Sequence, residues 1–354
     1  MTRVVGLMSG SSLDGLDIVL IDFQDKNWSL LKSDTISLPT DLAKSLATIC
    51  DQTAIELAHT QAAYSSFLST ALKTFMEGYS NIAVVGIHGH TVLHLPEIKT
   101  SWQLLNGGQV AAEINVPVVC DFRNQDMALG GQGTPMAVIA DRDLYPGYDY
   151  FINLGGIANI SYYDGKQWVA YDICPCNQVL NYFSSTMGLP YDNKGNIAKS
   201  GRINTKLLTT LNSTAFFHQA PPKSLDNSWI RNDFIKIVAD NELSIPDTLR
   251  TCTECIALQI AESIVTPNAK ILVTGGGSKN SYLIQLMKTQ LVNKNSDIII
   301  PDLQTVDYKE AILIAYCALL RLNKEVNFIT SATGASQAVI GGALYLGQNP
   351  TSDA

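Results

Sequence analysis

Three glycines, three serines and two aspartates gather near the start of the chain, and this combination suits phosphate binding. They lie between Gly6 and Asp17, with apolar runs on both sides. Small residues let backbone N–H groups surround an anion, hydroxyls add donors, and a carboxylate can hold a metal that bridges phosphates. Asp14-Gly15 between two β-rich runs also indicates a tight hairpin turn. Taken alone, the segment fits a phosphate-binding hairpin and an ordinary Gly/Ser turn equally well.

Two other groups could take part in phosphate or proton chemistry. Gly275-Gly276-Gly277 ends an apolar run and opens a helical pattern, where a nucleotide could lie close to bare backbone. A plain strand–helix turn explains these glycines as well. Asp172 ends another expected strand, where a carboxylate can act as a general base or can cap the helix that follows. No P-loop motif and no strand-linked G-x-G-x-x-G motif is present. Any phosphate must therefore be bound by the glycine turns of two meanders, the opening one and a second one that turns at Gly155-Gly156.

The histidines and cysteines are spaced poorly for a metal centre. His88 and His90 alternate on an expected strand end and should point to opposite faces, which favours hydrogen bonding in a pocket. Cys252 and Cys255 form a lone pair on an expected helix, whereas zinc sites need four ligands. The cysteine count of seven is odd, which indicates free thiols in a reducing compartment.

Composition predicts an acidic globular protein. With 354 residues, about two domains are expected, and 46% hydrophobic residues with 16% charged residues exclude a disordered chain. A net charge of −8 without a basic patch argues against nucleic acid and anionic membranes as partners. We expect no signal peptide and no membrane span, because the first residues lead into a strand and the longest apolar run is short. A cytoplasmic location is therefore expected.

The expected elements repeat in order. The chain opens with a three-strand meander up to residue 38, and a second meander occupies Tyr150–Leu154, 157–163 and 167–173. Helices and buried parallel strands follow each meander, among them the strand Ile82–Ile87 and a helix at Tyr308–Leu322 that carries Glu310 in its first turn. The first half is read as β-β-β-α-β-α-β.

Several motifs together resemble the anhydro-N-acetylmuramic acid kinase family over essentially the whole chain. They are Gly6-x-Met8-Ser9-Gly10-Ser11-Ser12-x-Asp14-Gly15-x-Asp17, His88-Gly89, Asp121-Phe122-Arg123, Ala128-Leu129-Gly130-Gly131-Gln132-Gly133, Asn153-Leu154-Gly155-Gly156-Ile157-Ala158-Asn159, Pro221-Pro222-Lys223-Ser224, Gly275-Gly276-Gly277 and Thr333-Gly334-Ala335-Ser336. Each motif is weak by itself, but this many in one order is specific.

The resemblance implies an α/β fold of the actin/hexokinase type. Two RNase-H-like domains, each with a β-meander plus parallel strands and flanking helices, are expected around a central cleft. The first domain would comprise 1–133 and 335–354, and the second would comprise 134–334 and carry the catalytic aspartate. The implied reaction is ATP-dependent: water opens 1,6-anhydro-N-acetylmuramic acid and O6 is phosphorylated, giving N-acetylmuramic acid 6-phosphate and ADP in cell-wall sugar recycling. Alternatives are a kinase of a different anhydro or amino sugar, and an inactive nucleotide-dependent sensor.

The resemblance also implies roles for individual residues. Asp172 would be the catalytic base, supported by Glu310. ATP would be bound by Gly10, Ser11, Ser12, Leu13, Asp14, Gly15, Leu16, Asp17, Gly155, Gly156, Gly275, Gly276 and Gly277. The sugar would be bound by His88, Arg123, Gln132 and Asn177. Asp14 would contact Mg²⁺ through ATP, and a homodimer is expected.

This sequence departs from the family pattern in a few places near the expected sugar site. The catalytic element falls on Asp172–Asn177, where Cys174 and Cys176 replace two glycines. The other departures are His90, Asn106-Gly107 and Asn124-Gln125. Because of these departures, the sequence does not determine which sugar is the substrate.

Overall fold

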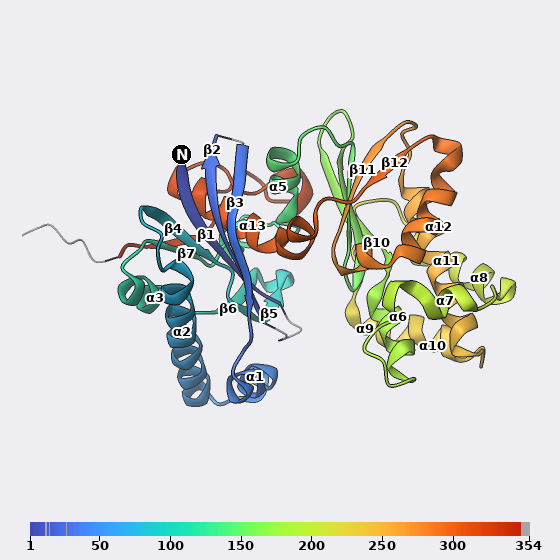
Figure 1. The fold of residues 1–354 in the computed structure, drawn as a ribbon, viewed down its shortest axis with the longest axis horizontal. Coiled ribbons are helices and arrows are strands. Elements are labelled where there is room, and N and C mark those ends of the chain that lie inside the picture. The colour runs from blue at the N-terminus through green and yellow to red at the C-terminus, as the bar shows by residue number, and fades with distance from the viewer. Residues whose placement is uncertain (11–12, 14, 26, 348–354) are drawn as a thin grey trace, which may run out of the picture. The chain divides into compact units, whose positions relative to one another are not determined.

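In the computed structural model, which describes residues 1–10, 13, 15–25 and 27–347, the chain divides into two units, each built on one main sheet. The first unit comprises Met1–Pro146 and the C-terminal part from Tyr308, and the second comprises Gly147–Asp307. Figure 1 shows the strands of each unit with their helices.

The first unit holds a six-stranded sheet with the order β13-β7-β4-β1-β2-β3. Its strands are β1 (Thr2–Ser9), β2 (Leu16–Gln24), β3 (Asn27–Ile36), β4 (Ile82–Ile87), β7 (Val118–Cys120) and β13 (Ala343–Tyr345). The meander β1-β2-β3 is antiparallel, whereas β4 pairs parallel with β1 and β7 pairs parallel with β4. The meander and the buried parallel strand predicted from the sequence are both confirmed.

The second unit repeats this topology in a five-stranded sheet with the order β10-β9-β8-β11-β12. Its strands are β8 (Tyr150–Leu154), β9 (Ile157–Tyr163), β10 (Trp168–Pro175), β11 (Lys270–Thr274) and β12 (Asp297–Ile299). Here too the first three strands are antiparallel, and the last two run parallel to the first. Numbered from its own start, the five-strand core of each unit reads 3-2-1-4-5. The duplicated α/β architecture is therefore confirmed.

Helices cover both faces of the first sheet. Helix α2 (Ala54–Met76) and helix α3 (Gly107–Ile114) pack on one face, in a core built around Tyr64 and Leu68. Helix α2 begins with a capping box in which Thr53 and Glu56 satisfy each other's backbone N–H groups. Helix α13 (Leu303–Leu322) packs on the opposite face.

Two strand glycines let α13 approach that opposite face closely. Gly6 and Gly86 are register partners on β1 and β4. A Cβ on Gly6 would lie 2.7 Å from Ala315 N, and one on Gly86 would lie 2.6 Å from Ile314 O. Only a residue without a side chain allows this helix to lie so near the strands.

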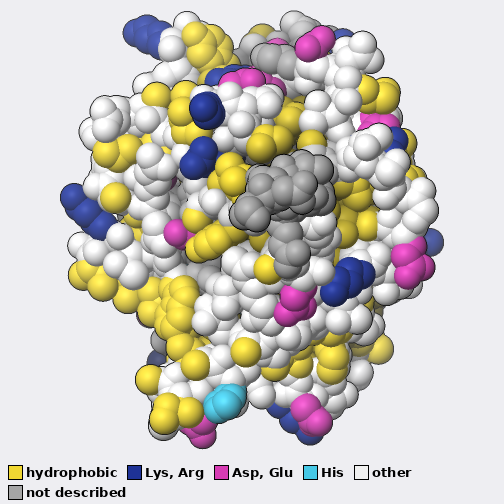
Figure 2. All heavy atoms as spheres, turned by 90° about the vertical axis from the view of Figure 1, so that its left-hand side faces the viewer, with side chains coloured by type: hydrophobic (Ala, Val, Ile, Leu, Met, Phe, Trp, Pro, Cys, Tyr) yellow, Lys and Arg dark blue, Asp and Glu magenta, His cyan; other side chains and the backbone are white. Residues whose placement is uncertain are grey.

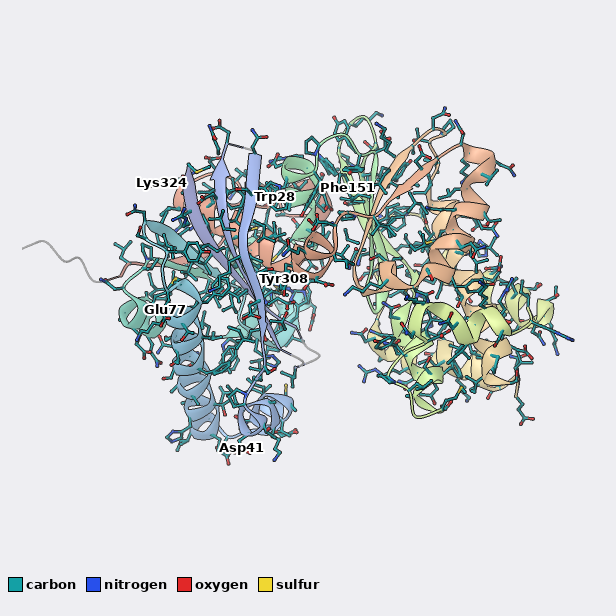
Figure 3. The ribbon with its side chains drawn as sticks, viewed as in Figure 1. Trp28, Asp41, Glu77, Phe151, Tyr308 and Lys324 are labelled. Atoms are coloured by element: carbon teal, nitrogen blue, oxygen red, sulfur yellow. The ribbon has the colours of Figure 1, made fainter. Side chains whose placement is uncertain are left out.

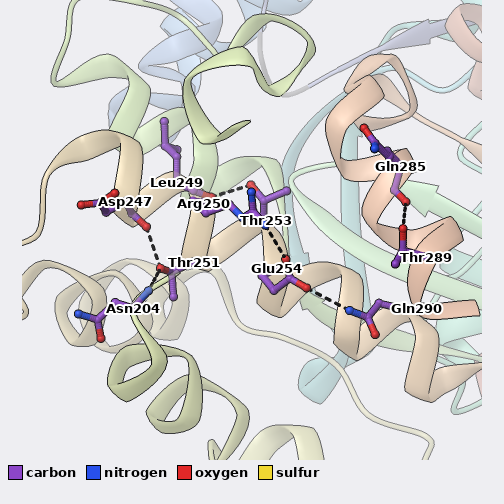
Figure 4. Close-up of polar contacts among 10 residues, drawn as sticks. All are labelled: Asn204, Asp247, Leu249, Arg250, Thr251, Thr253, Glu254, Gln285, Thr289 and Gln290. Carbon is purple, nitrogen blue, oxygen red and sulfur yellow. Dashed lines mark hydrogen bonds and ion pairs between the residues drawn. The ribbon is translucent and has the colours of Figure 1, made fainter. Parts of the chain in front are cut away.

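In the second unit, one helical core packs against the sheet. It contains α6 (Asn177–Ser185), α11 (Ile245–Ser263) and α12 (Ser281–Leu291). Helix α11 is buried along most of its length, so its polar side chains need partners inside the protein. Figure 4 shows several: Asn204 N donates to Thr251 Oγ1 (3.0 Å), and Gln290 Nε2 of α12 donates to Glu254 Oε1 (3.0 Å).

The remaining elements are short and connect these cores. They are α1 (Thr40–Ala47), β5 (His90–Leu95), β6 (Thr100–Leu104), α4 (Asn124–Ala128), α5 (Ala137–Leu144), α7 (Asn196–Ser200), α8 (Thr205–Asn212), α9 (Asn227–Trp229), a π-helical stretch at Ile230–Phe234, α10 (Ile235–Ala239) and α14 (Thr330–Thr333), with single 3₁₀ turns between them.

Two expectations for elements differ from the structure. The first half contains an additional strand, β5, which pairs with β6 in a separate two-stranded sheet. Helix α13 begins at Leu303, so Glu310 does not lie in its first turn. The helix starts early because Asp302 caps it, accepting from Thr305 N (2.9 Å) and Thr305 Oγ1 (2.7 Å).

The unit boundaries lie at 146/147 and 307/308, whereas the sequence suggested 133/134 and 334/335. Helix α5 stays with the first unit because it is tied to β3 and α13. Trp28 Nε1 on β3 donates to Leu144 O (3.2 Å), and the Tyr316 hydroxyl on α13 donates to Asp143 (3.0 Å). Figure 3 labels Trp28, whose ring also packs edge-on against Tyr145 with a centroid separation of 5.9 Å.

The surface shows scattered charges. On the face of the molecule drawn in Figure 2, basic and acidic side chains lie mostly singly among polar and apolar ones. In the part of the chain that the structure describes, no helix is both long enough and apolar enough to cross a membrane. All seven cysteines lie in this part of the chain, and each has a free thiol.

Candidate active site

The carboxyl ends of the parallel strands bring the predicted site residues of the first unit to one edge of its sheet. β1 ends at Ser9, β4 leads into His88, and β7 leads into Asp121 and Arg123. β2 is antiparallel to β1, so its first residues, including Asp17, lie at the same edge. Ligands of open α/β sheets bind outside the carboxyl ends of the strands.

The opening turn between β1 and β2 is only partly described. Ser11, Ser12 and Asp14, expected to contact ATP and magnesium, lie outside the described residues. Among the other residues expected to bind ATP, Leu13 has a positive φ of 56° and its N–H donates to Gly10 O (3.4 Å). Gly15 has no room for a side chain, because a Cβ would lie 2.8 Å from Thr35 Cγ2.

Leu16 is fully buried in the core of the first unit, so only its backbone can face a ligand. It pairs with Ser9 across the base of the turn.

Asp17 and Glu310 form a pair of neighbouring carboxylates. Thr35 Oγ1 donates to Asp17 Oδ1 (2.7 Å) and lies 3.4 Å from the hydroxyl of Tyr308, which Figure 3 labels near β3. The Glu310 side chain reaches solvent, yet the protein around it displaces enough water to raise its pKa. The charge of Asp17 raises this pKa further, whereas Arg123 and Lys309 oppose the shift. Two neighbouring carboxylates such as Asp17 and Glu310 can be neutralised by a bound cation.

Arg123 and His88, both predicted to bind the sugar, contact each other directly. His88 is 3% exposed, and its Nδ1 donates to Gly89 O (2.9 Å), because a carbonyl can only accept. Nε2 is therefore the unprotonated nitrogen, and it accepts from Arg123 Nη2 (2.9 Å). Burial, aided by the charge of Arg123, lowers the pKa of His88 to about 3. His88 is thus a neutral acceptor that orients a guanidinium.

Short distances through the β5–β6 hairpin connect the segments next to His88 and Arg123. A Cβ on Gly89 would lie only 3.2 Å from Gln103 Cβ, and Gln103 Nε2 donates to Ser101 Oγ (2.7 Å). Ser101 N donates to Asn124 Oδ1 (2.9 Å), and Asn124 follows Arg123 in the chain. Arg123 Nε is a buried donor with no partner among the described residues. The guanidinium is held by His88 at Nη2 and retains an unpartnered donor at Nε, so it can bind an anionic group.

Gln132 lies exposed on a loop that a buried carboxylate organises. Asp126 is 0% exposed, and it accepts from Gly133 N (2.7 Å) and Thr333 Oγ1 (2.7 Å). Gln132 N in turn donates to Thr333 O (2.8 Å), and Ser336 Oγ donates to Leu129 O (2.9 Å). Two motifs whose contacting residues are 207 positions apart in the sequence therefore form one structure.

In the second unit, the predicted residues gather around the ends of β8, β10 and β11. The carbonyl of Gly155 accepts from Asn177 N (3.2 Å), and the carbonyl of Gly156 accepts from Cys176 N (2.9 Å) and Gln178 N (3.1 Å). The glycine turn after β8 therefore binds the first turn of α6. Asn177 Nδ2 donates to Leu154 O (2.9 Å). The side-chain amide of this predicted sugar ligand therefore binds the same turn.

Gly275, Gly276 and Gly277 connect β11 to a 3₁₀ turn before α12. Gly275 has a φ of 81°, and a Cβ there would collide with Asn153 and Leu154 of the neighbouring strand β8. Nothing lies within 4 Å of a Cβ on Gly276, so its backbone is open. The arrangement fits the expected approach of a nucleotide to bare backbone.

Asp172 lies near the end of β10 and is partly buried. Its Oδ2 accepts from Leu225 N (2.8 Å) and from Ser224 Oγ (3.2 Å). Among the described residues, no hydrogen bond reaches Oδ1. Burial raises the pKa of Asp172, and the bonds from Leu225 and Ser224 act in the opposite direction. A carboxylate with one oxygen held and the other available suits proton transfer.

Cys174 and Cys176 follow Asp172, and both are buried. Burial raises the pKa of the Cys176 thiol to about 12 and raises that of Cys174 well above its usual value. Cys252 and Cys255 of α11 are buried in the same core. These thiols are protonated at neutral pH, so they act as small apolar groups.

Comparison with known proteins covers nearly the whole chain. The model of the family described as "Anhydro-N-acetylmuramic acid kinase" matches residues 2–347. A protein of that name from Vibrio vulnificus is 31% identical, covering 96% of this chain and 97% of its own length. Others are 32% identical in Sulfurovum (97% and 99% covered) and 31% identical in Haemophilus influenzae (96% and 97% covered).

The chain belongs to the anhydro-N-acetylmuramic acid kinase family. The resemblance stated from the motifs is thereby confirmed. The family model covers residues of both units, so the match includes both duplicated sheets and the turns at their strand ends.

Sequence reasoning did not identify several residues that shape the site of this family member. Thr35 donates to Asp17 and lies next to Tyr308, Ser101 donates to Asn124 beside Arg123, and Leu225 donates to Asp172. Gln103 in turn donates to Ser101. Ser224 belongs to the motif Pro221-Pro222-Lys223-Ser224, but the motif alone gives this serine no role. Apart from Gln103, which bonds Ser101 two residues away, these residues lie far in sequence from the groups they contact, and no local pattern predicts the contacts.

Proposed function

We propose that the protein is an ATP-dependent kinase that opens 1,6-anhydro-N-acetylmuramic acid with water and phosphorylates O6. Its products would be N-acetylmuramic acid 6-phosphate and ADP, within cell-wall sugar recycling. The observation that carries this proposal is the full-length match to the kinase family of that name. The described carboxylates and glycine turns supply groups suited to this chemistry.

Asp172 would act as the general base. It takes a proton from a water whose oxygen bonds to the anomeric carbon, and the bond between that carbon and O6 breaks. O6 then bonds to the γ-phosphorus of ATP, and the bond from that phosphorus to the ADP oxygen breaks. A positioned base typically contributes about 10²–10⁴-fold in rate. Alignment of the reactants and neutralisation of phosphate charge would supply the rest.

ATP would be bound by the strand-end turns. In the first unit these are the residues of the β1–β2 turn, and in the second they are the turns at Gly155-Gly156 and Gly275-Gly276-Gly277. Turns rich in glycine can bring backbone N–H groups close to phosphate oxygens, which is why we assign them this role.

Magnesium would accompany ATP. Within the described ranges, no three His, Cys, Asp or Glu side chains are grouped so that they could hold a metal. Asp17 and Glu310 are near enough to influence each other, and magnesium commonly takes one or two carboxylates together with phosphate oxygens and water. These two residues fit that role, and the ion would neutralise phosphate charge.

The sugar would be recognised by Arg123, His88 and Gln132. The guanidinium, held by His88, would bind the carboxylate of the lactyl group, because Arg pairs well with planar anions. Asn177, whose Nδ2 donates to Leu154 O, would also contact the sugar.

One assay tests the proposed function. ADP release is measured with ATP and 1,6-anhydro-N-acetylmuramic acid, with an anhydro-glucosamine sugar, and without sugar. We expect rapid release only with the first sugar. Faster release with the second would indicate a kinase of another anhydro or amino sugar, and no sugar-dependent release would indicate a nucleotide-dependent sensor.

We also propose a cytoplasmic homodimer, as the family resemblance suggests. Sedimentation equilibrium of the purified protein measures the mass in solution, and a monomer at all concentrations would contradict the dimer. Cell fractionation measures the location.

A further inference from the structure

A short segment, Lys223–Leu225, lies along the outer edge of β10 beside Asp172. β10 is the edge strand of its sheet, and its pairing with β9 shifts register between Asp172 and Cys174. An edge strand leaves backbone groups open to an additional partner. The segment Lys223–Leu225 is this additional partner of β10, because Asp172 N donates to Lys223 O (3.0 Å).

The same segment also holds the side chain of Asp172. Leu225 N donates to Oδ2 at 2.8 Å, and Ser224 Oγ donates to Oδ2 at 3.2 Å. Three consecutive residues therefore contact the backbone and one carboxylate oxygen of a single aspartate. In both bonds Oδ2 is the acceptor, and hydrogen bonds that a carboxylate accepts favour its ionised form.

The donors stand on an anchored segment. Lys223 Nζ donates to the carbonyls of Phe216 (3.1 Å) and Phe217 (3.2 Å), and it lies 4.6 Å from the centroid of the Phe216 ring. Leu225 is 8% exposed and belongs to the core of the second unit. The position of the two donors is thus set by packing, by the bonds of Lys223 and by the backbone bond from Asp172 N, and does not require the carboxylate of Asp172.

We propose that Ser224 and Leu225 are positioning residues that immobilise Oδ2 of Asp172 and direct Oδ1 to take the proton from the attacking water. This rests on the proposed function. With Oδ2 occupied by two donors, Oδ1 is the oxygen that can bind the water. The hydroxyl of Ser224 also helps to keep the carboxylate ionised against the effect of burial.

The variant Ser224→Ala tests this inference in the full-length protein. ADP release with ATP and 1,6-anhydro-N-acetylmuramic acid is measured as kcat and kcat/KM from pH 4.5 to pH 9. We expect kcat to fall about 3- to 10-fold at neutral pH, because one bond to a charged group is lost. The pH at which kcat/KM falls on the acid side of its profile should rise by about 0.5 to 1 unit, because a donor to the ionised form of Asp172 is removed. KM for ATP should not change.

Two further variants provide the rescue and the control. Ser224→Thr retains a hydroxyl and should restore both kcat and the pH at which kcat/KM falls on the acid side. Ser228→Ala removes a hydroxyl four residues away that contacts Asp226 (2.8 Å), and it should match the wild type. A Ser224→Ala profile that superposes on the wild-type profile, while Asp172→Asn is inactive, would overturn the positioning role alone. Full activity of Asp172→Asn would instead overturn the base assignment in the proposed function.

Discussion

Gly6 on β1 and Gly86 on β4 face each other in parallel register, and both lie directly under helix α13. Through this contact the sheet of the first unit determines where α13 lies, and α13 carries Glu310. Two residues without side chains therefore help to place a carboxylate of the candidate active site.

Replacing Gly86 with valine should destabilise the protein. A Cβ there would lie 2.6 Å from Ile314 O and 2.8 Å from Ala318 Cβ, so the helix must move. We expect a loss of about 1–3 kcal/mol in the free energy of unfolding, measured by urea denaturation. Gly276→Ala is the matched control, because nothing lies within 4 Å of its Cβ, and it should change this free energy by less than about 0.5 kcal/mol. Equal stability of Gly86→Val and wild type would contradict the close packing.

Asp172→Asn should fold normally and lose turnover by about 10²–10⁴-fold. An amide oxygen can still accept from Leu225 N, so the melting temperature should stay close to that of the wild type. In the wild type, activity should fall as the pH drops through a pKa above the usual value for aspartate, because burial raises it and the base must be ionised. Steady-state ADP release measures both effects. Asp164→Asn, in the β9–β10 turn of the same unit, serves as the control and should remain active.

Glu310→Gln should weaken the use of magnesium and ATP. Glu310 interacts electrostatically with Asp17, and losing a residue that supports the groups around a bound metal typically costs about 10- to 100-fold in metal affinity or activity. A titration of activity with Mg²⁺ at fixed ATP measures this change. Glu113→Gln, an exposed variant on α3, is the control. An unchanged Mg²⁺ dependence in Glu310→Gln would exclude the metal role.

His88 should make stability depend on pH. Its pKa of about 3 in the folded protein lies below the ordinary value near 6.5, so between these values the unfolded chain binds one more proton. Stability should therefore fall as the pH drops below about 6.5, by about 2 kcal/mol at pH 5. His88→Gln keeps an acceptor for Arg123 but cannot titrate, so it should lose less stability over that range. Urea denaturation at pH 7.5 and pH 5 compares the two proteins, and identical pH dependence would refute the buried neutral state.

Thr333→Val should loosen the loop that presents Gln132. Its hydroxyl bonds to the buried carboxylate of Asp126, and losing it leaves one oxygen unpaired at a cost of about 1–3 kcal/mol. Because the loop is proposed to contact the sugar, KM for the sugar should rise more than KM for ATP. Thr330→Val is the control, since the Thr330 hydroxyl makes no hydrogen bond to the described residues. A lower stability with unchanged KM values would contradict the proposed contact between this loop and the sugar.

The strand and helix patterns were largely readable from the sequence because each depends on nearby residues. Ile82–Ile87 and Tyr150–Leu154 have the predicted bounds, and both meanders formed where glycine or Asx turns separated β-rich runs. The strand β5 was missed because His90–Leu95 mixes polar and apolar residues and pairs only with β6. The extra turns at the start of α13 depend on a cap at Asp302, which lies beyond the apolar periodicity used to detect the helix.

The sequence by itself determined the family and the two repeated sheets, because these depend on residue types at short spacings. It also supplied the turns and carboxylates that we propose for phosphate binding and proton transfer. Only the tertiary structure decided which groups act on one another. Ser224 and Leu225 reach Asp172 across about 50 residues, and Thr333 reaches Asp126 across 207. Such contacts arise from strand order and helix packing, which no local pattern encodes. For the same reason the structure alone showed that Oδ2 of Asp172 is held while Oδ1 accepts no bond from the described residues.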